Sequence, residues 1–239
     1  MNRYIEENKN KLDIRKKDGQ LILYNESFDP KDIFTCGQCF NFFEEKDGSF
    51  TAVFLGKIIN LKKEEEKVII DNVSEEEFYD IFYDYFDLGV NYEEIKKEIS
   101  VDKTLKKATE YGAGIRILNQ EFFETLISFI ISANNQIPRI KKSVRIISEM
   151  YGDYIGEYKE RKYYSFPSPQ KLAKAKVEDL REKARVGFRD KRIVDTAKTI
   201  NDGFFDFNKD IRMPTKDLRK KLQELPGVGP KVADCILLF

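Results

Sequence analysis

The sequence predicts an α+β protein, with an N-terminal antiparallel β-sheet domain and flanking helices at residues 1–110, followed by a helical domain at residues 111–239. Two observations support this class. Apolar runs separated by turn residues occur in the first hundred residues, a pattern typical of strands. Later apolar residues recur every three or four positions, as they do in amphipathic helices.

Turn residues indicate where the strands lie. Asp47-Gly48 is a hairpin dipeptide between two apolar runs, and the acidic stretch Glu64–Glu66 separates two further runs. We therefore expect an antiparallel meander with strands at residues 21–24, 39–45, 50–55, 58–61 and 68–70.

The helices begin at recognisable caps. Ser74 and Glu77 form a capping-box pattern that predicts a helix through about Phe86, and Asn135 and Thr215 are suitable N-caps for two later helices. Residues 120–132 are apolar nearly all round, which predicts a central buried helix. The other expected segments are helices near residues 105–110, 137–147, 193–200 and 215–225, and an aromatic loop at residues 151–166.

Composition indicates a folded protein with an uneven charge distribution. The chain has 239 residues, of which 41% are hydrophobic and 13% aromatic, and its formal net charge is zero. Residues 62–98 hold five basic and thirteen acidic residues, a net charge of −8, so the rest of the chain carries +8. A basic excess outside one acidic segment is what a phosphate-binding face requires.

Cysteine and histidine usage narrows the chemistry. Three cysteines make a disulfide framework unfavourable and suit a reducing cytosol, and the absence of histidine excludes it as general base or metal ligand. We expect no metal and no cofactor. The N-terminus has no apolar signal segment, and no run reaches membrane-spanning length, so we expect no membrane association.

The last stretch of the chain predicts two helices joined by a glycine hairpin. Gly227 and Gly229 permit positive φ and close approach of another backbone, and Pro230 suits the first position of the following helix. The amides of Gly227, Val228 and Gly229 then point outward beside a helix N-terminus. Such a place suits a phosphate group.

Lys231 follows in the first turn of the second helix. The positive end of the helix dipole disfavours an ammonium there and favours the neutral amine, which can act as a nucleophile and form a Schiff base. The alternative is a lysine that contacts phosphate and does no chemistry. The spacing alone favours that alternative.

The stretch LPGVGPKVADC (residues 225–235) resembles the helix-hairpin-helix of DNA base-excision glycosylases, and its KVADC run resembles their 8-oxoguanine branch. The resemblance implies that Lys231 attacks the sugar C1′ of the damaged nucleotide and that Cys235 packs on the flipped base. It turns the prediction in favour of catalysis at Lys231.

Cys36 and Cys39 have the spacing of a zinc half-site. The chain has only one further cysteine and no histidine, so these residue types cannot supply the four ligands of a structural zinc site. The segment FTCGQCF (residues 34–40) instead resembles the Gly-Gln-x-Phe segment of the 8-oxoguanine glycosylases. This implies that the Gly37 carbonyl accepts the N7 hydrogen that 8-oxoguanine has and guanine lacks. A glycine at a strand bulge is the structural alternative.

Two further segments carry the resemblance. Asn134 and Arg139 match an Asn-Asn-x-Ile-x-Arg loop, which implies that Asn134 fills the gap left by the extruded base and that Arg139 contacts the opposite cytosine. Phe188 and Arg189 match a Gly-Tyr-Arg segment, in which the aromatic ring wedges beside that cytosine. From the residues alone, an exposed Phe188 suits a wedge that unstacks the duplex, while the flanking arginines, Arg189 among them, hold phosphate or a base edge. A core Phe188 in a solvated basic turn is the alternative.

The resemblance extends from about residue 20 to residue 239. The family places an aspartate beyond the second hairpin helix, and this chain ends at Phe239, so we expect it to be truncated and its activity alone to be in question.

Together with this resemblance, the sequence predicts a monomeric, bifunctional DNA glycosylase and AP lyase that excises 8-oxoguanine from duplex DNA. We expect it in the cytoplasm, at the nucleoid of a prokaryote, or in the nucleus of a eukaryote. One alternative is a glycosylase for another base, although many of those carry a four-cysteine iron–sulfur cluster that three cysteines cannot provide. The other is a non-catalytic DNA-binding module.

Overall fold

The computed structural model describes residues 12–239, which form two compact units. Unit 1 comprises the described residues up to Gln38 together with Phe42–Val53 and Ile58–Asn119. Unit 2 comprises Cys39–Asn41, Phe54–Lys57 and Gln120–Phe239. Residues 1–11 of the expected sheet domain lie outside the described part.

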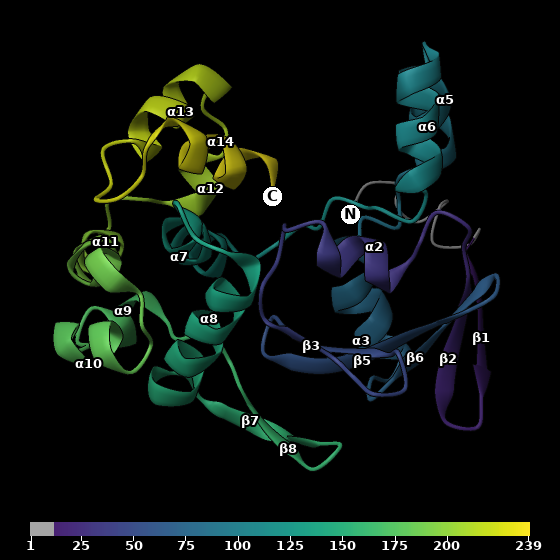
Figure 1. The fold of residues 1–239 in the computed structure, drawn as a ribbon, viewed down its shortest axis with the longest axis horizontal. Helices are drawn as coiled ribbons and strands as arrows, with labels where there is room; N and C mark the ends of the chain where they lie inside the picture. The colour runs from purple at the N-terminus through teal and green to yellow at the C-terminus, as the bar shows by residue number, and fades with distance from the viewer. Residues whose placement is uncertain (1–11) are drawn as a thin grey trace. The chain divides into compact units, whose positions relative to one another are not determined.

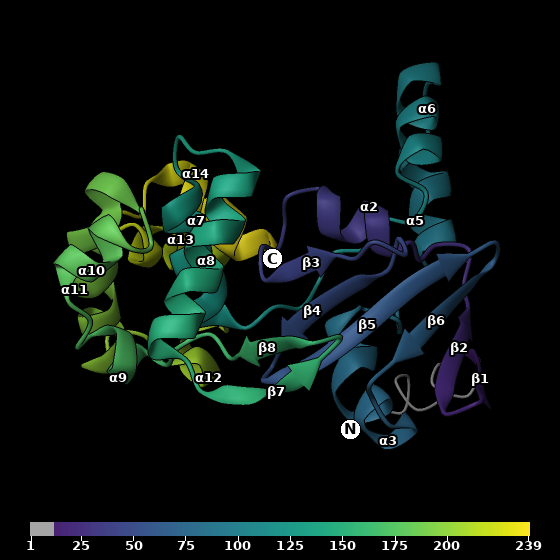
Figure 2. The same ribbon diagram turned by 60° about the horizontal axis from the view of Figure 1, so that its bottom comes forward.

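Unit 1 is built on a six-stranded antiparallel sheet, which confirms the α+β class (Figure 2). The predicted meander is present from β3 to β6, but β2 pairs with β6 rather than with β3. The strand order is β1-β2-β6-β5-β4-β3, and Leu23, Leu61 and Val68 are fully buried in it. The edge strand β1 is an addition that its polar sequence does not predict. The strands are β1 (Asp13–Lys17), β2 (Gln20–Tyr24), β3 (Phe42–Glu44), β4 (Phe50–Phe54), β5 (Lys57–Glu64) and β6 (Lys67–Asp71).

The predicted capping box is present, but the helix that follows it is not continuous. The Ser74 hydroxyl accepts a hydrogen bond from the Glu77 amide, and the Glu77 carboxylate accepts one from the Ser74 amide. A π-helical turn then interrupts the segment, and Phe78, Phe82, Tyr83, Tyr85 and Phe86 are all buried. These five positions are too closely spaced for one stripe of a regular helix. The helical segments of unit 1 are α2 (Pro30–Thr35), α3 (Glu75–Glu77), η1 (Phe78–Phe82), α4 (Tyr83–Tyr85), α5 (Tyr92–Ile99) and α6 (Lys103–Tyr111).

A buried arginine holds the irregular backbone of unit 1 together. Arg116 is 1% exposed, and its guanidinium donates to the carbonyls of Phe86 (2.9 Å), Ser27 (3.1 Å), Val90 (2.9 Å) and Asp87. Burying this charge is tolerable because its donors are paired with carbonyl oxygens.

Unit 2 is mainly helical (Figure 1). The apolar helix α7 contacts both α8 and α14, and confirms the predicted central helix. The elements are α7 (Phe122–Ser132), α8 (Ile137–Tyr151), β7 (Tyr154–Tyr158), β8 (Arg161–Tyr164), α9 (Pro169–Leu172), α10 (Val177–Glu182), η2 (Gly187–Arg189), α11 (Asp190–Asn201), α12 (Phe207–Asp210), α13 (Thr215–Leu222) and α14 (Pro230–Leu238).

Three local predictions for unit 2 are wrong. The expected loop at residues 151–166 contains the antiparallel pair β7–β8, whose turn residues Lys159 and Glu160 both have positive φ without the usual glycine or asparagine. The N-cap of α8 is Gln136 rather than Asn135, and the N-cap of α13 is Pro214 rather than Thr215. Neither cap makes a side-chain bond to the helix.

No helix in the described part of the chain is long and apolar enough to cross a membrane. The same residues contain no group of three or more histidine, cysteine, aspartate or glutamate side chains that could hold a metal ion.

A partly buried carboxyl at the start of α7 makes stability depend on pH. Burial, reinforced by the charge of Glu121 and opposed by a hydrogen bond with Asn41, raises the pKa of Glu124 from 4.5 to about 8. Between these two values the folded chain holds a proton that the unfolded chain releases. The free energy of unfolding should therefore fall as the pH rises through this window, by an amount on the order of a few kcal/mol.

Glu124→Gln should remove this dependence and make the protein more stable than the wild type at pH 8. Urea unfolding followed by far-UV circular dichroism at pH 5, 6.5 and 8 measures the effect. Glu149→Gln, on the solvent side of α8, is the control and should keep the wild-type slope. An unchanged slope in Glu124→Gln would contradict the assignment.

Candidate functional site

The α13–α14 hairpin has the predicted form, with one correction. Gly227 has a φ of +86°, and Pro230 is the first residue of α14. The Val228 amide donates to the Leu225 carbonyl at 3.1 Å, so the expectation of three outward amides is wrong for Val228. Among the described residues, the amides of Gly227 and Gly229 have no acceptor.

The two hairpin glycines are needed for different reasons. A Cβ at Gly227 would lie 3.3 Å from Arg192 and Ile130, so both its φ and its packing require glycine. Gly229 has a φ of −88°, and a Cβ there would meet no atom within 4 Å. The fold does not require glycine at Gly229, and the bare backbone there leaves room for a ligand.

Lys231 is exposed in the first turn of α14, and Cys235 follows one turn later on the same face. Burial raises the pKa of the Cys235 thiol, and the nearby Lys231 charge opposes the rise. Asp234 does not pair with the lysine, because it accepts two hydrogen bonds from Arg219, at 2.5 and 3.0 Å. Lys231 has no ion-pair partner among the residues that the structure describes.

Gly37 lies in unit 1, in a turn that Gln38 fixes. Gly37 has a φ of +90°, and the Gln38 side chain is buried. The Gln38 amide donates to the carbonyls of Ile33 (3.1 Å) and Arg116 (2.8 Å), and its oxygen accepts from the Leu118 amide (3.0 Å). Because Cys235 belongs to unit 2, the expected proximity of Gly37 and Cys235 stays a prediction.

The loop between α7 and α8 presents Asn134. This residue is exposed and has a φ of +51°, which asparagine tolerates better than most residues. Its neighbour Asn135 stabilises the loop, because its side chain donates to the Ile131 carbonyl (3.1 Å) and accepts from the Gln136 amide (2.9 Å). Arg139 is exposed in the first turn of α8.

The short helix η2 presents Phe188, which is 61% exposed, so the alternative of a core phenylalanine is wrong. Two guanidinium groups flank its ring, that of Arg189 at 4.3 Å and that of Arg192 at 5.5 Å from the centroid. Cation–π contacts of this kind restrain an exposed ring.

Arg189 is buried rather than presented to a ligand. It is 7% exposed, and it donates to the carbonyls of Val186 (3.0 Å), Asn134 (3.3 Å) and Ala133. Burial, together with the charge of Arg192, lowers the pKa of Arg189, although a guanidinium stays charged. In this structure the donors expected to contact a base instead join the Asn134 loop to the Phe188 turn.

Sequence reasoning missed the residue that anchors the hairpin. Thr196 in α11 is fully buried, and its hydroxyl donates to the Pro226 carbonyl at 2.6 Å. It lies on the apolar face of a helix and has no local signal that distinguishes it from a core residue. Gln38 could have been found, because it stands inside the segment that carries the resemblance.

Comparisons with known proteins identify the family. Residues 20–126 match the family model for the N-terminal domain of 8-oxoguanine DNA glycosylase. The apo structure of Clostridium acetobutylicum 8-oxoguanine glycosylase/lyase is 44% identical, with a TM-score of 0.88 over 95% of this chain and 79% of that one. The chain belongs to the 8-oxoguanine DNA glycosylase family.

Two further comparisons bear on the site. The C. acetobutylicum protein in complex with double-stranded DNA containing cytosine opposite 8-oxoG is 44% identical, with a TM-score of 0.88, over 95% of this chain and 78% of that one. The N-glycosylase/DNA lyase of Saccharomyces cerevisiae is 29% identical over 93% of this chain and 65% of its own length. The chain thus spans less than two thirds of that curated relative.

The Arg189 contacts predict how the Asn134 loop responds to mutation. Arg189→Met should leave buried carbonyls unpaired and destabilise the protein by about 1–3 kcal/mol. Amide hydrogen exchange should increase at residues 132–136, far from the mutated backbone in sequence. Arg189→Lys should restore part of the protection.

Arg192→Met is the matched control, because Arg192 also contacts the Phe188 ring but belongs to the exposed face of α11. Exchange at residues 132–136 should stay at the wild-type level in this variant. Equal exchange in all variants would show that Arg189 does not hold the loop.

Proposed function

We propose that the chain is a bifunctional DNA glycosylase and AP lyase that excises 8-oxoguanine from duplex DNA and acts as a monomer. Family membership supports the substrate. The observation that carries the chemistry is the exposed Lys231 at the N-terminus of α14, beside a hairpin with two available amides and without a carboxylate partner.

The hairpin and Lys231 suit attack on a sugar. The Gly227 and Gly229 amides hold a backbone phosphate of the damaged strand, so that the Lys231 amine faces C1′ of the flipped nucleotide. As the amine bonds to C1′ and releases a proton, the bond from C1′ to the base breaks, and the base leaves with the electron pair and takes up a proton. Opening of the sugar ring gives the Schiff base. Loss of a C2′ proton then breaks the C3′–O bond and nicks the strand.

The two loops joined by Arg189 suit base flipping. Extruding a nucleotide costs a few kcal/mol, and groups that fill the gap offset that cost. Asn134 and Phe188 are both exposed. Arg189 donates to backbone carbonyls in the Asn134 loop and in the turn before Phe188, so it holds both segments. In this assignment Asn134 fills the gap left by the flipped nucleotide, Phe188 wedges beside the opposite base, and Arg139 contacts that base. Arg189 contributes indirectly, by holding the two loops.

Recognition of the lesion is assigned to Gly37 and Cys235. The carbonyl of Gly37 would accept the N7 hydrogen, and the partly buried Cys235 would contact the face of the base. The protein would act where DNA is, at the nucleoid of a prokaryote or in a eukaryotic nucleus.

Lys231→Gln tests whether the chain is an enzyme or a binding module. The variant should lose the borohydride-trapped complex and strand nicking on an 8-oxoguanine·cytosine duplex, because glutamine cannot form a Schiff base. Binding of lesion DNA should persist, since the hairpin amides and the Asn134 loop are unchanged. Lys216→Gln, on the exposed side of α13, is the control and should be trapped like the wild type.

If Lys231 only contacts phosphate, the outcome is different. Lys231→Gln would then weaken binding and lower the slope of log affinity against log salt by about one unit. Nicking at saturating protein would be retained, and that result would end the Schiff-base proposal.

Arg139→Ala tests the opposite-strand assignment. The variant should lose about 1–3 kcal/mol of preference for cytosine over other bases opposite the lesion, because a direct base contact is sequence-selective. Single-turnover excision with each of the four opposite bases measures this preference. Arg145→Ala, later in α8, should keep it. An equal loss against every opposite base would reassign Arg139 to the DNA backbone.

A further inference from the structure

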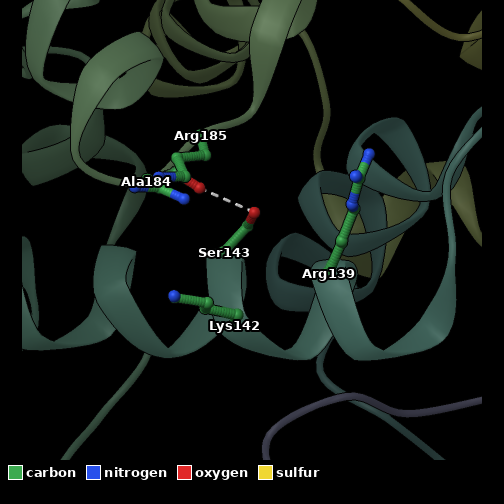
Figure 3. Close-up of a pocket in the computed structure, with 5 residues that line it drawn as sticks. All are labelled: Arg139, Lys142, Ser143, Ala184 and Arg185. Carbon is green, nitrogen blue, oxygen red and sulfur yellow. Dashed lines mark hydrogen bonds between the residues drawn. The ribbon is translucent and has the colours of Figure 1, made fainter.

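Unit 2 contains a basic pocket of which the proposed function uses only Arg139. Its volume is about 460 Å³, and it is lined by Arg139, Lys142 and Ser143 of α8 and by Ala184 and Arg185 of the turn after α10 (Figure 3). The buried Ser143 hydroxyl donates to the Ala184 carbonyl at 2.7 Å and fixes the turn against the helix. No carboxylate is among the lining residues.

The charges of this pocket are uncompensated. Arg139, Lys142 and Arg185 are all exposed, and none of them forms an ion pair with any described residue. Three unpaired cations around one cavity repel one another, so they raise the free energy of the empty site and favour an anion in it.

The backbone at Arg185 points to the same conclusion. Arg185 has a φ of +56°, and the turn closes through a bond from the Val186 amide to the Leu180 carbonyl at 3.2 Å. Glycine or asparagine would fit the left-handed region with less strain. The arginine side chain is neither buried nor paired, so neither the turn nor the core explains its presence. The Arg185 guanidinium is therefore available to an anion in the pocket.

We propose that this pocket binds a backbone phosphodiester of the DNA strand opposite the lesion, a proposal that rests on the proposed function. The hairpin must hold the damaged strand, because Lys231 reacts with its sugar. The pocket begins at Arg139, assigned to the opposite base, and continues one turn along α8 to Lys142. Arg185 reaches it from the turn that leads into the Phe188 wedge. The pocket therefore lies on the side of the opposite base and flanks it with positive charge.

The decisive variant is Arg185→Gly, which removes the cation and relieves the strained backbone. Affinity for an 8-oxoguanine·cytosine duplex, measured by fluorescence anisotropy at several salt concentrations, should fall. The slope of log affinity against log salt should decrease by about 0.9 for one lost phosphate contact. The melting temperature should stay the same or rise, which excludes misfolding as the cause. Lys142→Gln should lower the slope similarly, and Lys162→Gln on β8 should not change it.

Strand assignment is tested by neutral methylphosphonate linkages placed near the lesion in one strand at a time. Substitution in the opposite strand should weaken binding by the wild type and weaken Arg185→Gly no further. Substitution in the damaged strand should weaken both proteins equally. Unchanged affinity and slope in Arg185→Gly, or equal effects of both strands in both proteins, would overturn the pocket assignment.

The same titrations on undamaged duplex separate the two proposals. If the wild type has no preference for the lesion but Arg185→Gly still loses affinity and slope, the pocket assignment stands and the proposed function falls. If the wild type prefers the lesion and Arg185→Gly has the same affinity and slope as the wild type, the pocket assignment is wrong and the proposed function is unaffected.

Discussion

The candidate site in unit 2 depends on the contacts of Arg189 with backbone carbonyls. The loop after α7 and the turn before α11 have no sheet or helix ladder to hold them, so their carbonyls need other donors. A guanidinium offers several donors in a fixed plane, and Arg189 uses them on Val186, Ala133 and Asn134. The exposed tips of both segments are thereby held by one buried side chain.

Unit 1 uses the same solution around Gly37. Arg116 is paired with four carbonyls, and its own carbonyl accepts a bond from Gln38, the neighbour of Gly37. In both units a buried cation holds irregular backbone next to an exposed or strained residue. Each arrangement is sensitive to mutation, because removal of the cation leaves several buried acceptors unpaired at once. Irregular backbone can therefore be held in one conformation close to residues that we propose to contact the substrate.

Local sequence signals were sufficient to predict most of the fold. The apolar run of α7, the Asp47-Gly48 hairpin and the capping box at Ser74 each have a local cause within a few residues. The failures have different physical causes. Strand β1 is polar because it is an edge strand, the β7–β8 turn lacks glycine, and the π-helical turn follows from the burial of crowded aromatic side chains. None of these leaves a periodic signal.

The exposure of the candidate site residues was predictable for some of them and not for others. Asn134, Phe188 and Lys231 are exposed, as their places in polar or basic stretches suggest. Arg189 misled the prediction because a basic run indicates a solvated surface, whereas its burial is decided by carbonyls some fifty residues away in the chain. The Val228 amide was likewise mispredicted, because it donates to the Leu225 carbonyl within the hairpin turn.

The hairpin separates what the fold requires from what a ligand requires. Gly227 is fixed by packing against α7 and α11, and the Thr196 bond to Pro226 ties the same turn to α11. Once that turn is rigid, the Gly229 amide and the Lys231 side chain need no partners of their own, and the structure gives them none among the described residues. Arg219 donates two hydrogen bonds to Asp234, the carboxylate nearest to Lys231 in sequence. Asp234 is therefore not available to neutralise the lysine. The stabilising contacts of α14 thus leave Lys231, the residue proposed to react, without a competing charge.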